Sequence, residues 1–197
     1  KRETPLFNNL EKGNEFFEME TPQATIVFGQ RGFGRKNKDY FAARVLNYVL
    51  GGGGFQSRLY KEVREKNGLV YSIYSYLMPY ESDGVIIGGF QTRNKNVDET
   101  ILKVKQEWEK MKNQGISANE LKEAKTYYKG SFSRNFTSTI SIATLLKVVQ
   151  YYDLGKDYFA NRSEIIDNLK LKEINSLASR IFDEKNLFFM IVGKRNM

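Results

Sequence analysis

The chain has 197 residues, of which 41% are hydrophobic and 27% charged, so it has the composition of an ordinary globular protein with room for one sizeable core. It contains no histidine and no cysteine, which excludes nearly every zinc, copper or haem site and every catalytic triad built on either residue. The 31 basic and 23 acidic residues give a net charge of +8. Acidic and basic side chains alternate, as in residues 61–66, which is typical of solvated helix faces and argues against a nucleic-acid partner. No apolar run approaches the roughly 20 residues of a membrane span, so we expect neither a transmembrane helix nor a signal peptide.

The first part of the chain predicts a linker, two strands and a helix. Residues 1–13 carry proline, asparagine and glycine without periodicity, and we expect a linker from a preceding domain that leads into a strand at 15–20. Residues 24–29 are β-branched and compact, which predicts an inner strand. After a loop at 30–38, helical spacing over 39–50 places five residues on one side: Tyr40, Ala43, Leu46, Asn47 and Leu50.

A run of four glycines, residues 51–54, is expected to end this helix, because glycine loses more backbone entropy in a helix than any other residue. A short amphipathic helix at 56–65 then places Phe55, Leu59 and Val63 on one face. The Asn67-Gly68 pair stops it. The glycine run lacks the spacing of a phosphate-binding loop, so we interpret it as a flexible connection between helices.

Two alternating stretches rich in tyrosine, valine and isoleucine, 69–77 and 84–92, predict an antiparallel hairpin with a turn at 79–83. The rest of the chain predicts helices at 97–111, 118–128, 138–152, 157–169 and 172–182 and a final strand at 187–192. This order of elements indicates an α+β domain, a largely antiparallel sheet with helices packed on one face.

Two of these helices begin with the pattern of a capping box. Asn96 stands three residues before Glu99, and Ser117 stands three residues before Glu120. In such a pair each side chain bonds the backbone N–H of the other residue. We therefore expect the two helices to start at these positions.

Residues 46–72, LNYVLGGGGFQSRLYKEVREKNGLVYS, carry the most specific pattern in the chain. This stretch closely resembles the signature of the second-type, zinc-free domain of the pitrilysin/insulinase superfamily of zinc metallopeptidases, the group that includes mitochondrial processing peptidase. The likeness extends over nearly the whole chain, to the Lys129-Gly130-Ser131 step and the terminal residues 191–193. It implies that residues 14–197 form one half of a clamshell-shaped peptidase, of bacterial type because the glycine run is short.

The resemblance also implies a division of labour. The zinc of such peptidases is held by an H-x-x-E-H helix in the other domain, and a chain without histidine cannot form that motif. We therefore expect no cofactor in this chain, zinc in a partner domain or subunit, and an unfolded peptide as substrate. The residues that match the family's substrate-binding and catalytic positions are Arg64 and Tyr71, and the glycines that match its chamber loop are Gly51, Gly52, Gly53 and Gly54. A guanidinium and a phenol O–H aimed at a peptide carbonyl would stabilise the oxyanion formed during hydrolysis.

Three functions remain open at this point. The first is the metal-free part of a zinc metalloendopeptidase, inactive as an isolated domain, in which Arg64 and Tyr71 act on the substrate carbonyl. The second is an inactive scaffold or interaction subunit of the same fold. The third is a basic nucleic-acid-binding module, which would need a contiguous basic face. The compartment is not determined; we expect a soluble protein of the bacterial cytoplasm or periplasm.

Overall fold

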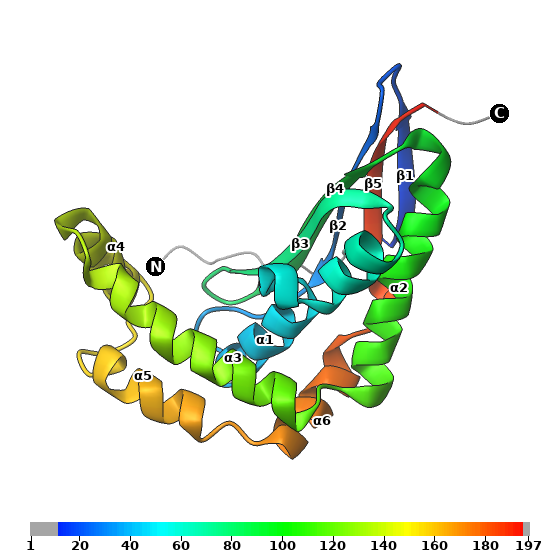
Figure 1. The fold of residues 1–197 in the computed structure, drawn as a ribbon. Helices are drawn as coiled ribbons and strands as arrows, with labels where there is room; N and C mark the ends of the chain where they lie inside the picture. Colours follow the sequence, from blue (N-terminus) through cyan, green and yellow to red (C-terminus); the bar gives the residue numbers. More distant parts are fainter. Residues whose placement is uncertain (1–11, 195–197) are drawn as a thin grey trace.

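The computed structural model describes residues 12–194, whose strands form one five-stranded sheet in the order β1-β5-β2-β4-β3 (Figure 1). β1 runs parallel to β5, and every other neighbouring pair is antiparallel, which confirms the largely antiparallel sheet. The strands are β1 (Gly13–Glu18), β2 (Ala24–Arg31), β3 (Val70–Pro79), β4 (Gly84–Thr92) and β5 (Phe188–Gly193).

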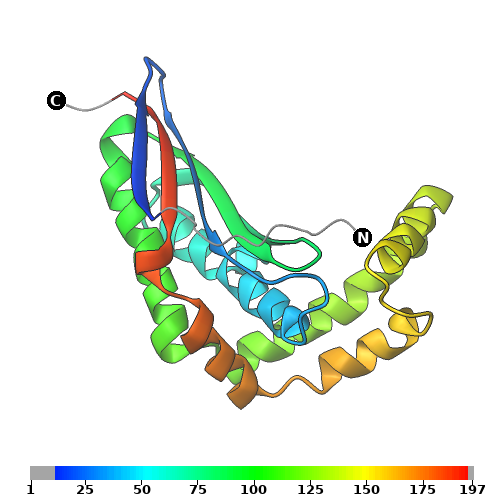
Figure 2. The ribbon, with the colours of Figure 1, turned by 180° about the vertical axis from the view of Figure 1, so that it is seen from behind.

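The helices cover one face of this sheet and leave the other open, as Figure 2 shows from behind. α1, α2 and α6 lie on the covered face, whereas α3 runs away from the sheet with α5 alongside it and α4 at its far end (Figure 1). The helices are α1 (Tyr40–Asn47), α2 (Val97–Gln114), α3 (Ala118–Gly130), α4 (Thr139–Tyr151), α5 (Tyr158–Asp167) and α6 (Leu171–Ile181). The predicted α+β class with helices on one face is therefore confirmed.

The core between sheet and helices is centred on Trp108 of α2, which is fully buried. Its ring meets Phe28 of β2 and Phe182 edge-on, with centroids 5.6 and 5.8 Å apart. The indole N–H donates to Gln30 Oε1 over 2.6 Å, and Gln30 Nε2 donates to the Ile181 carbonyl over 2.7 Å. One buried amide thus satisfies a tryptophan and the end of α6, as buried polar groups require.

The two predicted capping boxes have different outcomes. At the start of α3, Ser117 Oγ accepts from the Glu120 N–H and Glu120 Oε2 accepts from the Ser117 N–H. At the start of α2 the prediction is wrong, because the Asn96 side chain caps no backbone N–H. A 3₁₀ turn, Asn94–Asn96, leads directly into that helix and leaves Asn96 outside the extended conformation that a capping residue usually adopts.

The prediction that the glycine run ends the first helix is also wrong for its first two members. Helical backbone continues from α1 through η1 (Tyr48–Gly52), a π-helical segment. Gly51 is buried against β3, and a Cβ built on it would lie 2.4 Å from Ser75 Oγ. Glycine is therefore needed here for close packing of a helix on a strand, and the interpretation as a flexible connection fails at this position.

The next helical turns form as expected, with one exception. Leu59 and Val63 are fully buried, but Phe55 is 70% exposed and does not share their face. Phe55 belongs to the separate 3₁₀ turn η2 (Gly54–Gln56), which sets its direction independently of the helix.

Most of the predicted linker, residues 1–11, lies outside the described residues, and β1 already begins at Gly13, which pairs with Phe188. Among residues 12–194 no helix is both long and apolar enough to cross a membrane.

Candidate functional site

Arg64 sits in the last turn of η3 (Tyr60–Lys66), the π-helical segment that leads into β3. Asn67 caps the end of this helix, and the next residue, Gly68, has a φ of +59°, the left-handed conformation that glycine adopts without strain. The Gly68 N–H donates to the Arg64 carbonyl and the Leu69 N–H to the Val63 carbonyl, at 3.0 and 3.1 Å. The first of these bonds, from the residue after the cap to the carbonyl four positions back, is that of the αL C-cap motif, so the Asn67-Gly68 stop is confirmed and the chain reverses directly behind Arg64.

Tyr71 points to solvent because β3 carries a bulge where it begins to pair with β4. The register shifts between Val70 and Ile73, so that Tyr71 and Ser72 both face outward instead of alternating. As a result the Tyr71 side chain is 86% exposed on the edge strand of the described sheet. Bulges of this kind re-aim a side chain at the margin of a sheet.

The reversal brings the two predicted site residues together. The guanidinium carbon of Arg64 lies 5.7 Å from the centroid of the Tyr71 ring. Arg64 also lies 4.8 Å over the ring of Tyr60, and its Nη1 donates to the Tyr60 hydroxyl. Phe55 meets Tyr60 edge-on at 4.9 Å. We call these four residues, Phe55, Tyr60, Arg64 and Tyr71, the Arg64 cluster.

Sequence reasoning missed Tyr60 and Phe55. Tyr60 stands four residues before Arg64, a spacing at which side chains of one helix meet, so it could have been found. Tyr60 is buried, and its ring and hydroxyl hold the guanidinium in place. Phe55 gave no such signal, because its contact depends on the 3₁₀ turn inserted after the glycine run.

Among residues 12–194, no carboxylate forms an ion pair with the Arg64 guanidinium. Glu62, two residues before Arg64, instead forms ion pairs with Lys66 over 2.9 Å and with Lys103 over 3.9 Å. The hydrogen bond from Lys66 holds the pKa of Glu62 below its ordinary value. Within residues 12–194 no ion pair includes Arg64, and the Tyr71 hydroxyl has no hydrogen-bond partner. Both groups are therefore available to an incoming acceptor.

Arg58 fixes the beginning of the same helical stretch to the rest of the fold. Its Nε and Nη2 donate to the two carboxylate oxygens of Glu120 over 2.7 and 2.8 Å, and Nη2 also donates to the Gly115 carbonyl over 2.9 Å. Burial acts to raise the pKa of Glu120, but the bonds from Arg58 and Ser117 outweigh it, so the pKa lies below its ordinary value. This bidentate pair anchors the helix that carries Arg64 to the turn between α2 and α3.

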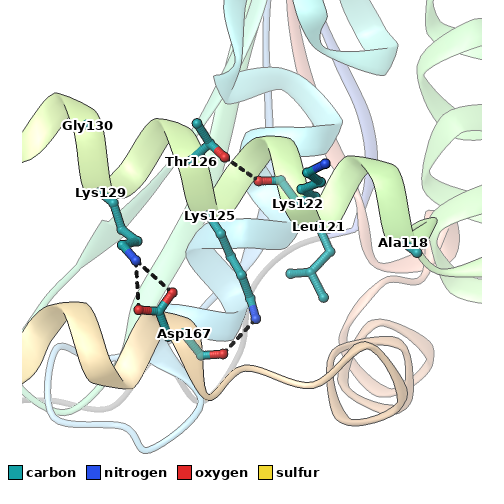
Figure 3. Close-up of a pocket in the computed structure, with 8 residues that line it drawn as sticks. All are labelled: Ala118, Leu121, Lys122, Lys125, Thr126, Lys129, Gly130 and Asp167. Carbon is teal, nitrogen blue, oxygen red and sulfur yellow. Dashed lines mark hydrogen bonds and ion pairs between the residues drawn. The ribbon is translucent and has the colours of Figure 1, made fainter.

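A surface groove of about 650 Å³ between α3 and α5 is separate from the Arg64 cluster (Figure 3). In it Lys125 Nζ donates to the Asp167 and Leu169 carbonyls over 2.8 and 2.7 Å, and Lys129 pairs with the Asp167 carboxylate at 2.7 Å. Lys125 thus satisfies free carbonyl groups at and just beyond the C-terminal end of α5, so the lysines of this groove are explained by their role in holding α3 and α5 together. It is lined by Ala118, Leu121, Lys122, Lys125, Thr126, Lys129, Gly130 and Asp167.

The residues of this chain do not fit a zinc ion. Histidine and cysteine are absent from the sequence, and within residues 12–194 no three acidic side chains gather as a metal site would require. What the Arg64 cluster offers instead is hydrogen-bond donation: a guanidinium with donors to spare and an exposed phenol, both beside an edge strand.

Comparison with known proteins gives a consistent result. Residues 2–128 match the family model described as the peptidase M16 inactive domain. Over 188 residues the chain is 34% identical to a Bacillus subtilis (strain 168) protein named uncharacterized zinc protease YmxG, covering 90% of this chain and 43% of that protein. It is 30% identical over 199 residues to a Helicobacter pylori (strain ATCC 700392 / 26695) protein named non-peptidase homolog YmxG, covering 98% of this chain and 45% of the other.

Solved structures agree with the fold. A crystal structure described as the peptidase M16 inactive domain from Pseudomonas fluorescens superposes with a TM-score of 0.85 at 27% identity, covering 93% of this chain and 44% of that one. The chain spans less than half the length of the curated relatives that it matches most fully.

Proposed function

This chain belongs to the peptidase M16 inactive-domain family, and on that premise we propose that it is the metal-free half of a zinc-dependent peptidase that supplies Arg64 and Tyr71 to peptide hydrolysis. In this proposal the domain closes the substrate chamber, and both side chains donate to the carbonyl oxygen of the peptide bond. The zinc and the attacking water belong to a partner domain or subunit, since the sequence has no histidine or cysteine and residues 12–194 hold no acidic cluster that could bind the metal.

The observation that carries the proposal is the pairing of Arg64 with Tyr71. Their 5.7 Å separation, the 86% exposure of Tyr71 and the absence of a carboxylate partner for Arg64 among residues 12–194 support the proposal, because they leave two donors close together and open to a ligand. As water attacks a peptide carbonyl, negative charge grows on its oxygen, and preorganised donors stabilise that charge more than they stabilise the ground state. One such donor typically lowers the activation barrier by about 3 kcal/mol.

The exposed apolar surface of helix α4 supports the proposal that this domain packs against a partner domain. Of its 13 residues only Lys147 is charged, and none is buried. Ile140 and Leu146 are 78% and 55% exposed. Exposed apolar patches of this kind mark interaction sites. Because the curated relatives are more than twice as long as this chain, we propose that the zinc-binding peptidase half lies against α4.

A second candidate is a scaffold of the same fold without peptidase activity. The name of the Helicobacter pylori relative, a non-peptidase homolog, favours it, at 30% identity over nearly the whole chain. The two functions differ in their requirement for Arg64 and Tyr71. The peptidase half needs both side chains for hydrolysis, whereas a scaffold needs neither.

The test is steady-state hydrolysis of a quenched fluorescent peptide by the full-length protein, or by this chain reassembled with its zinc-bearing partner. Arg64→Ala and Tyr71→Phe are each expected to lower kcat and kcat/KM together by roughly 10²-fold or more, since the lost interaction develops only in the transition state. Arg64→Lys should restore little, because a flexible point charge lacks the planar fork of donors.

Two matched variants control for changes of charge and of surface chemistry. Lys61→Ala removes a positive charge from an exposed position of the same helix, and Tyr74→Phe removes a hydroxyl from an exposed tyrosine of the same strand. Both should leave kcat within about twofold of the parent, because exposed polar sites away from the chemistry contribute little. Peptidase activity in the parent with unchanged kcat in folded Arg64→Ala and Tyr71→Phe would refute the roles of both residues. A parent without activity in the presence of its partner would favour the scaffold.

A further inference from the structure

A second cavity, of about 600 Å³, lies where α1, the end of β3, α3, α4 and α5 meet. Four arginines line it, Arg35, Arg44, Arg134 and Arg162, together with tyrosine, phenylalanine and aliphatic side chains. None of the lining residues is aspartate or glutamate, and neither Arg64 nor Tyr71 is among them. The cavity is therefore strongly positive and independent of the proposed peptidase role.

Two of these arginines are withdrawn from water, with Arg35 only 8% and Arg162 only 5% exposed. A buried charge is costly unless a counter-charge compensates it. No ion pair among residues 12–194 includes any of the four arginines. The fold thus concentrates positive charge here without neutralising it.

Aromatic rings hold the guanidiniums in position. The guanidinium carbon of Arg35 lies 4.1 Å from the centroid of Tyr40, that of Arg44 lies 4.6 Å from Tyr128, and that of Arg162 lies 4.2 Å from Phe132. Ring faces attract cations but carry no net charge, so they orient the arginines and leave their charge in place.

Among residues 12–194, few of the N–H donors of these arginines are used within the protein. Arg35 Nη2 donates to the Tyr158 hydroxyl, and Arg162 Nη1 donates to the Tyr128 carbonyl over 3.0 Å. Each guanidinium has five N–H donors in a planar fork. Most of the donors around the cavity therefore remain for a ligand.

The arginines are also close enough to repel one another. Burial lowers the pKa of Arg162 below its ordinary value, and the positive charges of Arg44 and Arg35 lower it further. An anion placed among them would relieve both effects at once.

We propose that this cavity is a binding site for an oxyanion, a carboxylate or a phosphate, carried on a ligand with an apolar body. Guanidinium forks match the geometry of both oxyanions. The wall supplied by Leu145, Val148 and Val149 of α4 suits an apolar body, and a volume of about 600 Å³ is that of a small-molecule site.

The first test is a titration of the full chain with inorganic phosphate and, in a separate arm, with benzoate, at an ionic strength held constant with sodium chloride. The melting temperature is expected to rise saturably in at least one arm, by about 5–10 °C at a hundredfold excess over Kd. The arm that responds identifies the oxyanion. If the melting temperature in both arms equals that in sodium chloride alone at the same ionic strength, the proposal is overturned.

The second test uses Arg35→Met and Arg162→Met. Each should abolish the response, and each should melt at or above the temperature of the parent without ligand, because a buried unpaired charge has been removed. Arg180→Met is the matched control, since Arg180 is an exposed arginine that pairs with Asp39 at 3.5 Å. It should keep the full response.

A folded Arg35→Met or Arg162→Met chain that binds as well as the parent overturns the assignment to this cavity, as does equal loss of binding in Arg180→Met. If one variant fails to fold, the other decides. If both fail, the titration of the parent against matched chloride decides.

Discussion

Replacing Gly51 by alanine tests the finding that the glycine run serves packing at its start. A Cβ at this position would lie 2.4 Å from Ser75 Oγ, 2.8 Å from Ser75 N and 2.9 Å from Leu59 Cδ1. One of these neighbours, Ser75 N, is backbone of the β3–β4 hairpin, which cannot move aside as a flexible side chain could. The Ser75 hydroxyl, which donates to Asn47 Oδ1 over 2.9 Å, must rotate away.

The magnitude follows from three contributions. Forcing a methyl group into a packed core costs about 1–3 kcal/mol. The lost hydrogen bond costs about 1 kcal/mol. The better helix propensity of alanine returns about 1 kcal/mol. The free energy of unfolding should therefore fall by about 1–3 kcal/mol, and 2 kcal/mol in a chain of this size lowers the melting temperature by about 4–8 °C.

Gly130→Ala is the matched control. Gly130 closes α3 with helical backbone, and a Cβ there would meet nothing within 4 Å. Alanine gains helix propensity at no steric cost, so the melting temperature should rise by about 1–3 °C. Thermal melts followed by circular dichroism measure both variants. If Gly51→Ala melts at or above the parent, the packing argument is refuted and the run is a flexible connection.

Two further predictions concern buried polar contacts. Glu120→Gln should lower the free energy of unfolding by about 1–3 kcal/mol near neutral pH, because the charged bonds from Arg58 to the carboxylate are lost. Because the folded pKa of Glu120 is depressed, this contribution exists above the unfolded pKa of about 4.3 and is lost as pH falls through the folded pKa, so melts from pH 7 to pH 3 should converge at the acid end. A constant gap down to pH 3 would contradict this. Gln30→Ala should lower the free energy of unfolding by about 2–4 kcal/mol, because it leaves the Trp108 N–H and the Ile181 carbonyl unpaired in the core. Chemical denaturation should then show a lower midpoint, and an unchanged midpoint would contradict this.

The sequence by itself determined the elements and the family. Its periodicity placed the buried stripe of α1 correctly, because a helical face that packs on a sheet must repeat its apolar residues every three or four positions. Local chemistry was equally decisive at the Ser117 cap and the Gly68 stop, where neighbouring backbone groups make all the bonds. The absence of histidine excluded the zinc ligands of the family motif.

Only the tertiary structure decided the features that depend on contacts between distant segments. Gly51 became a packing residue because β3 lies against it. The exposure of Tyr71 depends on a bulge opposite β4, which strand alternation alone does not reveal. The arginine-lined cavity unites Arg35 with Arg162, 127 positions further along the chain by numbering (162 − 35 = 127), and no local pattern brings them together. Periodicity records which face of an element is buried, whereas the neighbours of that face are chosen by the topology of the whole chain.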